Sequence, residues 1–411
     1  MPNFASSLVL RDRRILYGAA FVRALATGLM GVLLAIYLVK RGFQPFEIGI
    51  IVSAGLLGAA VAALVVTLSD VAGQRRMLVV VALFGALGGL VLSFSLGFYA
   101  TTAAAFLGMV NGMGRDRGAS LILDQAMLSE NASDMERTRI FAWYNVLQDV
   151  GHALGALIAG MPALFHGMGE DNAIASLQAA VWIYAGILLT TVFLYEGLAP
   201  RRAEQVSRKQ PPISFESRKI LWKIASLFAL DSMASGFLTT ALLSFFFYER
   251  FGISVGLIGM LFFGARVANV GSHLAAAWLA KRIGLVNTMV FTHIPSSLLL
   301  MTVAFAPSFS VAAILFLLRE GLVEMDVPTR QSYVMAVVKP EERTFVSGVT
   351  HIVRMGAWAV APAFAGALMK GASFNILLFV GASMKIVYDL LLYISFRRLR
   401  PPEEQRLQME K

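Results

Sequence analysis

Long apolar segments, separated by short polar ones, follow one another along almost the whole chain. A helix needs about 20 apolar residues to cross a bilayer core of about 30 Å, and about twelve segments approach that length. They lie at residues 15–39, 46–69, 77–97, 99–128, 140–162, 174–196, 220–248, 254–280, 286–306, 308–336, 345–368 and 372–396. The pattern predicts an all-α membrane protein with twelve transmembrane helices.

The composition favours a membrane protein over a soluble enzyme. Hydrophobic residues make up 57% of the 411 positions and charged residues 15%, whereas a soluble domain has about 25% charged residues. The absence of cysteine excludes disulfides, iron–sulfur clusters and zinc sites built on cysteine. The five histidines show no metal-ligand spacing, and no Gly-x-x-x-x-Gly-Lys-Ser/Thr motif indicates ATP hydrolysis. We therefore expect no catalytic residues, no metal and no cofactor.

The distribution of Lys and Arg predicts the orientation in the membrane, because cytoplasmic loops carry an excess of both. With the N-terminus inside, the outer loops hold only Lys40, Arg41, Arg250 and Lys370. We therefore expect a multi-pass protein of the cell inner (plasma) membrane with both termini in the cytoplasm. The net charge of +10 then reflects topology, and no nucleic-acid partner is expected. The first apolar segment is too long for a cleavable signal peptide.

The chain consists of two related halves. A long polar segment divides six spans from six, and Glu-Arg-Thr leads into the fifth span at 136–138 and again into the eleventh at 342–344. These features predict two pseudo-symmetric six-helix bundles. The boundaries are an N-terminal bundle at 1–197, a cytoplasmic linker at 198–219, a C-terminal bundle at 220–400 and a cytoplasmic tail at 401–411.

The loop between the second and third spans carries a motif. Residues 66–75 read Val-Thr-Leu-Ser-Asp-Val-Ala-Gly-Gln-Arg. Leu68, Asp70, Gly73 and the following basic pair match Gly-x-Leu-Ala-Asp-Arg-x-Gly-Arg-Arg, although the leading Gly and the Arg after Asp are missing. A weaker copy at 279–284 has Lys in place of Asp. With its two six-span halves, the chain resembles a member of the major facilitator superfamily over essentially its whole length.

The resemblance implies a secondary transporter whose halves rock around a site at the bilayer midplane. Its loop motif implies a latch on the cytoplasmic side, where a carboxylate near helix N-termini is favoured by the helix dipole. The two arginines after the motif either pair across this gate or only anchor the loop at lipid headgroups. The predicted cytoplasmic gate comprises Asp70, Arg75, Arg76, Asp124, Asp326 and Arg330.

Charged residues inside the spans are the candidates for substrate binding and coupling. Each costs about 2.5–3.5 kcal/mol on insertion scales and therefore needs a cavity or a partner. Arg23 and Asp231 fall at equivalent places in the two halves, and we hypothesise that they pair in one transport state. Asp149, His152 and Asp231 are candidate proton carriers. The predicted substrate-binding or coupling residues are Arg23, Asn111, Arg115, Arg117, Asp149, His152, Asp231, Arg319, Glu320 and Arg354.

The fourth and tenth spans hold the densest groups of charges. On a continuous helix, Arg115 shares a face with Asn111. The resemblance implies that an arginine of the fourth span contacts substrate or an acidic partner, and a structural ion pair is the alternative for both Arg115 and Arg117. In the tenth span Pro328 predicts a kink. We interpret it as a hinge beside the inner gate, and gate pairing alone is the alternative for Asp326 and Arg330.

The fifth span bears on the direction of transport. Exporters of the superfamily often carry Gly-x-x-x-Gly-Pro-x-x-Gly-Gly there, and this chain keeps Gly151, Gly155 and Gly160 with Ala in place of Pro. This likeness favours export, although small residues at such spacing also allow close helix packing without any antiport.

The expected function is secondary active transport of a small organic solute by alternating access, most simply proton-coupled export. The intramembrane arginines favour an anionic or zwitterionic solute. Proton symport or facilitated uptake is the alternative, and a transporter-like receptor or a membrane enzyme is a remote one. The expected partners are the solute, protons and the lipid bilayer, and the chain is expected to be a monomer.

Overall fold

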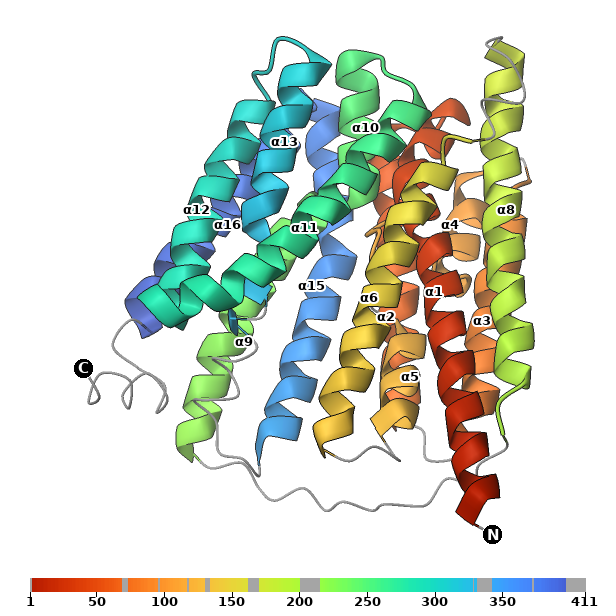
Figure 1. Cartoon of the computed structure of the whole chain (residues 1–411). Helices are drawn as coiled ribbons and strands as arrows, with labels where there is room; N and C mark the ends of the chain where they lie inside the picture. Colours follow the sequence, from red (N-terminus) through yellow and green to blue (C-terminus); the bar gives the residue numbers. More distant parts are fainter. Residues whose placement is uncertain are drawn as a thin grey trace. The chain divides into compact units, whose positions relative to one another are not determined.

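The structure of the chain is a computed structural model in which helices form all the regular structure of the described residues (Figure 1). The described residues are 2–68, 73–94, 97–116, 118–129, 134–161, 170–199, 215–327, 329–330, 342–371 and 373–396. Their helices are α1 Pro2–Lys40, α2 Pro45–Leu68, α3 Gln74–Leu92, α4 Phe98–Leu107, α5 Ala119–Ser129, α6 Asp134–Ile158, α8 Glu170–Glu196, α9 Phe215–Phe237, α10 Thr240–Phe251, α11 Val255–Ile283, α12 Leu285–Val303, α13 Phe309–Val323, α15 Arg343–Gly371 and α16 Ile376–Phe396.

The helices have the length and composition of membrane spans. Nine helical stretches of the described residues are long and apolar enough to cross a bilayer, one of them formed by α9 and α10 together. The predicted all-α membrane class is confirmed. The predicted fourth, fifth and tenth spans also contain helix, as α4 with α5, α6 and α13, but they are not among the nine. The count of twelve stays a prediction.

Two compact units make up the chain. Unit 1 comprises Met1–Val206, Thr239–Phe263 and Pro362–Gly371, and unit 2 comprises Ser207–Leu238, Gly264–Ala361 and Ala372–Lys411. The helix α10, the start of α11 and the end of α15 therefore group with unit 1. The predicted linker at 198–219 lies largely outside the described residues, so the predicted bundle boundaries stay a prediction.

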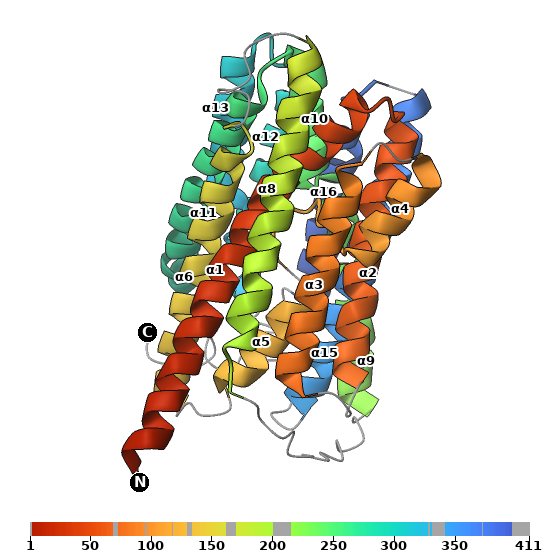
Figure 2. The same cartoon turned by 90° about the vertical axis from the view of Figure 1, so that its right-hand side faces the viewer.

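In unit 1, α1 packs against α6, α8 and α10, and α3 packs against α8. Figure 2 shows α1, α8 and α3 side by side. The contact between α1 and α6 is close because α6 presents glycine: a Cβ atom on Gly155 would lie 2.1 Å from the carbonyl oxygen of Leu25, and one on Gly151 would lie 2.7 Å from that of Phe21. Close packing thus accounts for these two small residues of the fifth span.

The fourth span is interrupted. Helix α4 ends at Leu107 and α5 begins at Ala119, and the described residues between them are not helical. Gly114 has a φ of 71°, which glycine adopts readily. The shared helical face expected for Arg115 and Asn111 is therefore wrong. Instead, the Asn111 side chain accepts from the Met113 backbone at 2.8 Å and donates to the Arg115 carbonyl at 2.7 Å.

The interruption is stabilised by the start of α10. The backbone N–H of Ala241 donates to the carbonyl of Gly112 at 2.9 Å, and the Thr240 hydroxyl donates to the carbonyl of Met113 at 2.9 Å. Non-helical backbone is tolerated at membrane depth only where its polar groups are satisfied inside the protein. These contacts provide two such partners.

In unit 2, α9 packs against α16, and α12 packs against α13 and α16. Its core includes the buried side chains of Phe228, Val346 and Tyr388. Helix α13 ends at Val323, and Glu324 and Met325 form a turn. The tenth span is thus interrupted where the sequence predicts a kink, although Pro328 itself lies outside the described residues.

Candidate functional site

A buried polar cluster lies in unit 1 around Arg23 of α1. We call it the Arg23 cluster. The guanidinium of Arg23 forms ion pairs with Asp124 of α5, at 2.8 Å, and with Asp116. Asp116 belongs to the non-helical segment between α4 and α5, which we call the interrupted segment. It also donates to the hydroxyl groups of Tyr144 in α6, at 3.2 Å, and Tyr195 in α8. The Tyr144 hydroxyl donates to Asp124 at 3.0 Å. The cluster therefore joins four helices and the interrupted segment.

The Arg23 cluster contains one guanidinium and two carboxylates. Arg23 is 7% exposed and Asp124 is fully buried. Because buried charges need partners, the dense contacts explain how Arg23 is held inside a span. When both carboxylates are ionised, the cluster carries one net negative charge, which a bound proton would neutralise.

His152 of α6 is connected to the same region. It is buried, and its Nε2 atom accepts a hydrogen bond from the Asp116 backbone at 3.1 Å. Asp149, one turn earlier on α6, is half-buried and forms no ion pair with another described residue. Arg115 is half-buried on the interrupted segment, and Arg117 lies outside the described residues. Of the described candidates of the first half, Asp149 and His152 thus lie on α6, and Arg115 lies on the interrupted segment.

A second buried cluster lies in unit 2 around Asp231 of α9. We call the group Asp231, His293, Arg330, Lys385 and Asp389 the Asp231 cluster. Lys385 of α16 donates to one oxygen of Asp231 at 3.1 Å, and Arg330 donates to the other at 2.9 Å. Arg330 also pairs with Asp326, four residues earlier, at 2.9 Å.

A row of polar contacts runs through the Asp231 cluster. His293 of α12 contacts the carboxylate of Asp389 through Nδ1 at 3.0 Å, and its Nε2 lies 3.4 Å from the Lys385 ammonium. An ammonium group only donates, so Nε2 accepts and Nδ1–H donates to Asp389. This arrangement fits a neutral imidazole. A second proton on His293 would set an N–H group against the ammonium and repel Lys385.

Arg354 of α15 is the accessible cation beside this cluster. Its side chain is 17% accessible, and its Nη2 atom lies 3.9 Å from the nearest oxygen of Asp231. Nε donates to the Ser232 hydroxyl at 3.2 Å. The guanidinium lies over the rings of Trp358, at 4.7 Å, and Phe228, at 5.7 Å. An arginine that lies over aromatic rings and is partly accessible is suited to an anionic group.

A metal ion fits this region less well than an anion. Asp231, His293 and Asp326 offer ligand atoms within 4.8 Å of one another. However, both oxygens of Asp231 already bind cationic side chains, and a divalent cation would have to displace them or lie beside them. We therefore assign no metal to these residues.

The remaining predicted site residues contact a nearby group, have no partner among the described residues, or lie outside the described residues. Arg75 donates to the carbonyl of Glu196 at 2.6 Å, at the end of α8, and Arg76 is exposed. Arg319 and Glu320 are buried and pair with each other. Asp70 lies outside the described residues, so the predicted latch is not described. Arg23 and Asp231 each have partners in their own unit, and their mutual pairing stays a prediction.

Sequence reasoning did not select His293, Lys385 and Asp389, which complete the Asp231 cluster. Lys385 and Asp389 stand four residues apart within an otherwise apolar span, which places them on one helix face. That spacing was a usable signal. No local pattern links either residue to His293 or Asp231, because the contacts join α9, α12 and α16.

Comparisons with known proteins agree with this architecture. The sequence profile of the Major Facilitator Superfamily matches residues 16–362 and 224–411. The chain is 26% identical to the uncharacterized membrane protein YJR124C of Saccharomyces cerevisiae over 94% of each chain.

Solved structures share the fold. The nucleoside transporter NupG matches with a TM-score of 0.72 and 14% identity, covering 94% of this chain and 99% of NupG. The D-xylose–proton symporter matches with a TM-score of 0.71 and 11% identity over 94% and 97% of the two chains. The human organic anion transporter MFSD10 matches with a TM-score of 0.62 and 19% identity over 93% and 99%.

These matches span nearly the whole chain, as the sequence motifs and apolar spans predict, and they indicate a transporter rather than an enzyme. The chain belongs to the Major Facilitator Superfamily and is a membrane-embedded transporter of a small-molecule solute.

Proposed function

We propose that this chain is a proton-coupled transporter of a small organic solute with a negatively charged group, and that it exports this solute. Arg354 is the observation that carries the proposal. It combines an accessible guanidinium, a 3.9 Å separation from its nearest carboxylate oxygen, and two flanking aromatic rings. A carboxylate or phosphate of the solute would complete the hydrogen bonding of this guanidinium.

The Asp231 cluster supports proton coupling. Protonation of His293 would repel Lys385 from its position between His293 and Asp231. With Lys385 displaced, Asp231 loses one of its two close cations and is freer to attract Arg354. A proton on His293 therefore changes how strongly Asp231 attracts Arg354, and with it the positive charge available to a solute. Such a link between proton binding and solute binding is the requirement for coupling.

Export is the proposed direction because the fifth span resembles the exporter pattern. Proton symport and facilitated uptake are the alternatives. The organic anion transporter MFSD10 and the D-xylose–proton symporter have this fold, so the fold itself accommodates an anionic solute in one case and proton coupling in another.

We also propose a location in the cell inner (plasma) membrane with both termini cytoplasmic, and a monomer as the working form. The small number of Lys and Arg residues in the predicted outer loops supports the orientation.

A ligand screen with the purified chain tests the substrate class. Organic anions, zwitterions, nucleosides and neutral sugars are compared by the shift in melting temperature that each causes. We expect stabilisation by an anionic or zwitterionic compound, and loss of that shift in Arg354→Gln.

Arg282→Gln is the matched control, because Arg282 also lies over a tryptophan ring, that of Trp278, at 4.3 Å, but belongs to the end of α11. It should keep the shift. Stabilisation by neutral compounds alone, or a shift that survives in Arg354→Gln, contradicts the proposed substrate class.

A further inference from the structure

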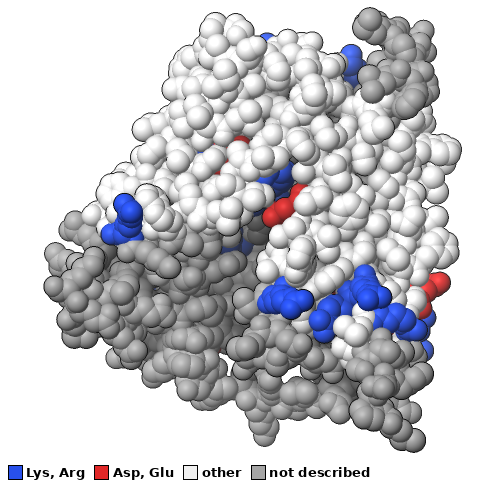
Figure 3. All heavy atoms as spheres, viewed as in Figure 1, with Lys and Arg blue, Asp and Glu red and all other residues white. Residues whose placement is uncertain are grey.

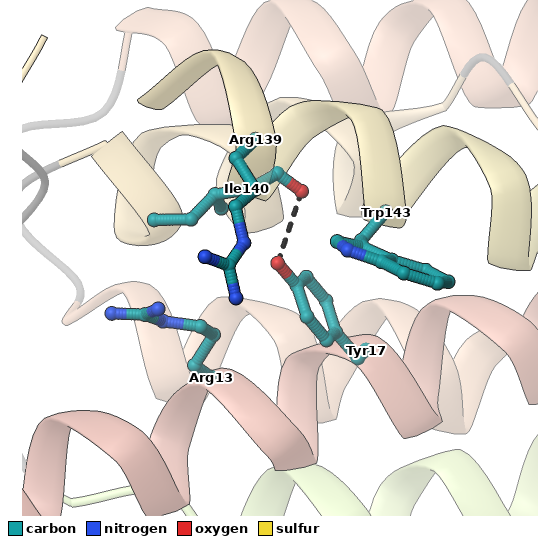
Figure 4. A pocket seen from close by; sticks show the side chains of 5 residues that line it. All are labelled: Arg13, Tyr17, Arg139, Ile140 and Trp143. Carbon is teal, nitrogen blue, oxygen red and sulfur yellow. Dashed lines mark hydrogen bonds between the residues drawn. The ribbon is translucent and has the colours of Figure 1, made fainter. Parts of the chain in front are cut away.

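A small pocket lies between α1 and α6 in unit 1, apart from both buried clusters. It has a volume of about 180 Å³ and is lined by Arg13 and Tyr17 of α1 and by Arg139, Ile140 and Trp143 of α6 (Figure 4). The Tyr17 hydroxyl donates to the carbonyl of Ile140 at 3.0 Å and thereby joins the two helices. We call this site the Arg13–Arg139 pocket.

Both cations of the pocket lie on the same side of the Tyr17 ring. Figure 4 shows the guanidinium groups of Arg13 and Arg139 on one side of the Tyr17 ring and Trp143 on the other. No acidic residue is among the described side chains that line the pocket. Among the side chains that the structure describes, which exclude those of residues 134–138, neither arginine has a carboxylate within ion-pair distance. Asp12, the neighbour of Arg13, instead accepts from the Ala199 backbone at 3.3 Å and from Arg11 at 3.5 Å.

Two guanidinium groups around one cavity favour an anion with several oxygens. A guanidinium binds a phosphate through two parallel hydrogen bonds, and none of the described side chains that line the pocket is a carboxylate that competes for these donors. The chemistry of the pocket therefore selects a phosphate group.

The order of the lining residues favours a phosphate attached to an apolar chain. On each helix the aromatic residue follows the arginine by four positions, which is about 6 Å along the axis. A layer of cations is therefore followed by a layer of aromatic rings. Aromatic residues of this kind collect at the boundary between headgroups and acyl chains. Trp143 is 56% exposed and is available to lipid.

The surroundings of the pocket agree with a membrane boundary. Figure 3 shows Lys and Arg atoms gathered toward the lower end of unit 1, where Figure 1 draws the starts of α1 and α6, and mostly uncharged residues above them. Basic pockets between membrane helices on the cytoplasmic side bind anionic headgroups.

We propose that the Arg13–Arg139 pocket binds the phosphate of an anionic phospholipid, with the acyl chains lying along Trp143. Bound there, the lipid bridges α1 and α6 and stabilises their contact. The site is separate from solute transport and does not depend on the proposed substrate.

Lipid binding by the full chain in detergent tests the proposal. Phosphatidylglycerol and phosphatidylcholine with identical acyl chains are titrated, and binding is followed by native mass spectrometry and by the melting temperature. We expect phosphatidylglycerol to bind at least about tenfold more tightly, because each basic residue adds to the attraction for an anionic headgroup. Equal binding of the two lipids would overturn the proposal.

The double variant Arg13→Gln with Arg139→Gln should lose this preference. The matched control is Arg14→Gln with Arg282→Gln, which removes the same charge from two exposed arginines outside the pocket, and it should keep the preference. An equal loss in both double variants would mean that charge alone, without the pocket, attracts the lipid, and would overturn the site.

Two further measurements complete the test. The first distinguishes a phospholipid from a free phosphate, and the second locates the lipid without relying on the folding of the arginine variants. Inorganic phosphate and glycerol 3-phosphate should give no comparable shift, and an equal shift would overturn the lipid as ligand. In the unmodified pocket, phosphatidylglycerol with brominated chains should quench tryptophan fluorescence more than the matched phosphatidylcholine. That excess should disappear in Trp143→Phe, and an unchanged excess would place the lipid elsewhere.

Discussion

Arg23 organises the buried polar groups of unit 1. Its guanidinium contacts two carboxylates and two tyrosine hydroxyls from α5, α6, α8 and the interrupted fourth span. In a low-dielectric interior these contacts offset the cost of removing the charge from water. The residue therefore contributes to stability through the elements that it joins, in addition to any role in transport.

Replacing Arg23 with Gln should destabilise the chain by about 3–5 kcal/mol, because Asp124 is left buried without its cation. Thermal unfolding in detergent measures the loss. Adding Asp124→Asn should recover part of the stability, since the uncompensated carboxylate is then removed. Arg76→Gln, at an exposed position, is the control and should leave the melting temperature unchanged. A melting temperature of Arg23→Gln equal to that of the parent chain would contradict this account.

At this scale the sequence identifies the charged residues but not their partners. A lone arginine in the first span is conspicuous against apolar neighbours, so Arg23 was predicted as a functional candidate. Its predicted partner, Asp231, followed from symmetry between the halves. The structure places Asp116 and Asp124 beside it, and the pairing with Asp231 in one transport state stays a prediction. Asp116 reaches Arg23 from a non-helical segment whose course no helical spacing describes.

At the scale of elements, hydropathy predicts the continuous spans well and the interrupted ones poorly. Segments such as α2, α8 and α16 are long and uniformly apolar, so their length alone identifies them. The fourth span is less uniformly apolar, and it contains Asn-Gly and a second glycine at 111–114. These residues are a turn signal and mark the interruption. Its stability depends on Thr240 and Ala241, which are distant in the sequence.

The contact of α6 with α1 gives a test at this scale. Gly155→Ala should destabilise the chain by about 1–3 kcal/mol, because the new methyl group would overlap the carbonyl of Leu25 and force the helices apart. Gly186→Ala, in α8, is the matched control, since no atom lies within 4 Å of a Cβ added there. It should be neutral or stabilising. Chemical or thermal unfolding of the two variants compares them, and an equal effect of both would rule out the close packing.

At the scale of the whole molecule, the absence of cysteine makes the orientation simple to test. Single cysteines are introduced in place of Gln44, between α1 and α2, and Arg14, near the start of α1; both positions are exposed. We expect a membrane-impermeant maleimide to label Gln44→Cys in intact cells and Arg14→Cys only after permeabilisation. The parent chain, which has no thiol, is the control. The reverse labelling would invert the predicted topology.

The whole-molecule fold follows from the sequence more completely than the site does. The repeated apolar spans and the loop motif at 66–75 are local features that can be recognised in a single sequence. The Asp231 cluster is assembled from α9, α12, α16 and the tenth span, and its geometry depends on packing. For this reason the family could be predicted, whereas the partners of each charge could not.

Proton movement driven by the solute tests the central proposal most directly. The chain is reconstituted into vesicles that contain a pH-sensitive dye, and the solute identified by the ligand screen is applied as a gradient without any imposed pH difference. Proton-coupled export predicts that protons move opposite to the solute, and that an imposed pH gradient accelerates solute flux. Solute flux at an unchanged rate, with no accompanying change in pH, would contradict it.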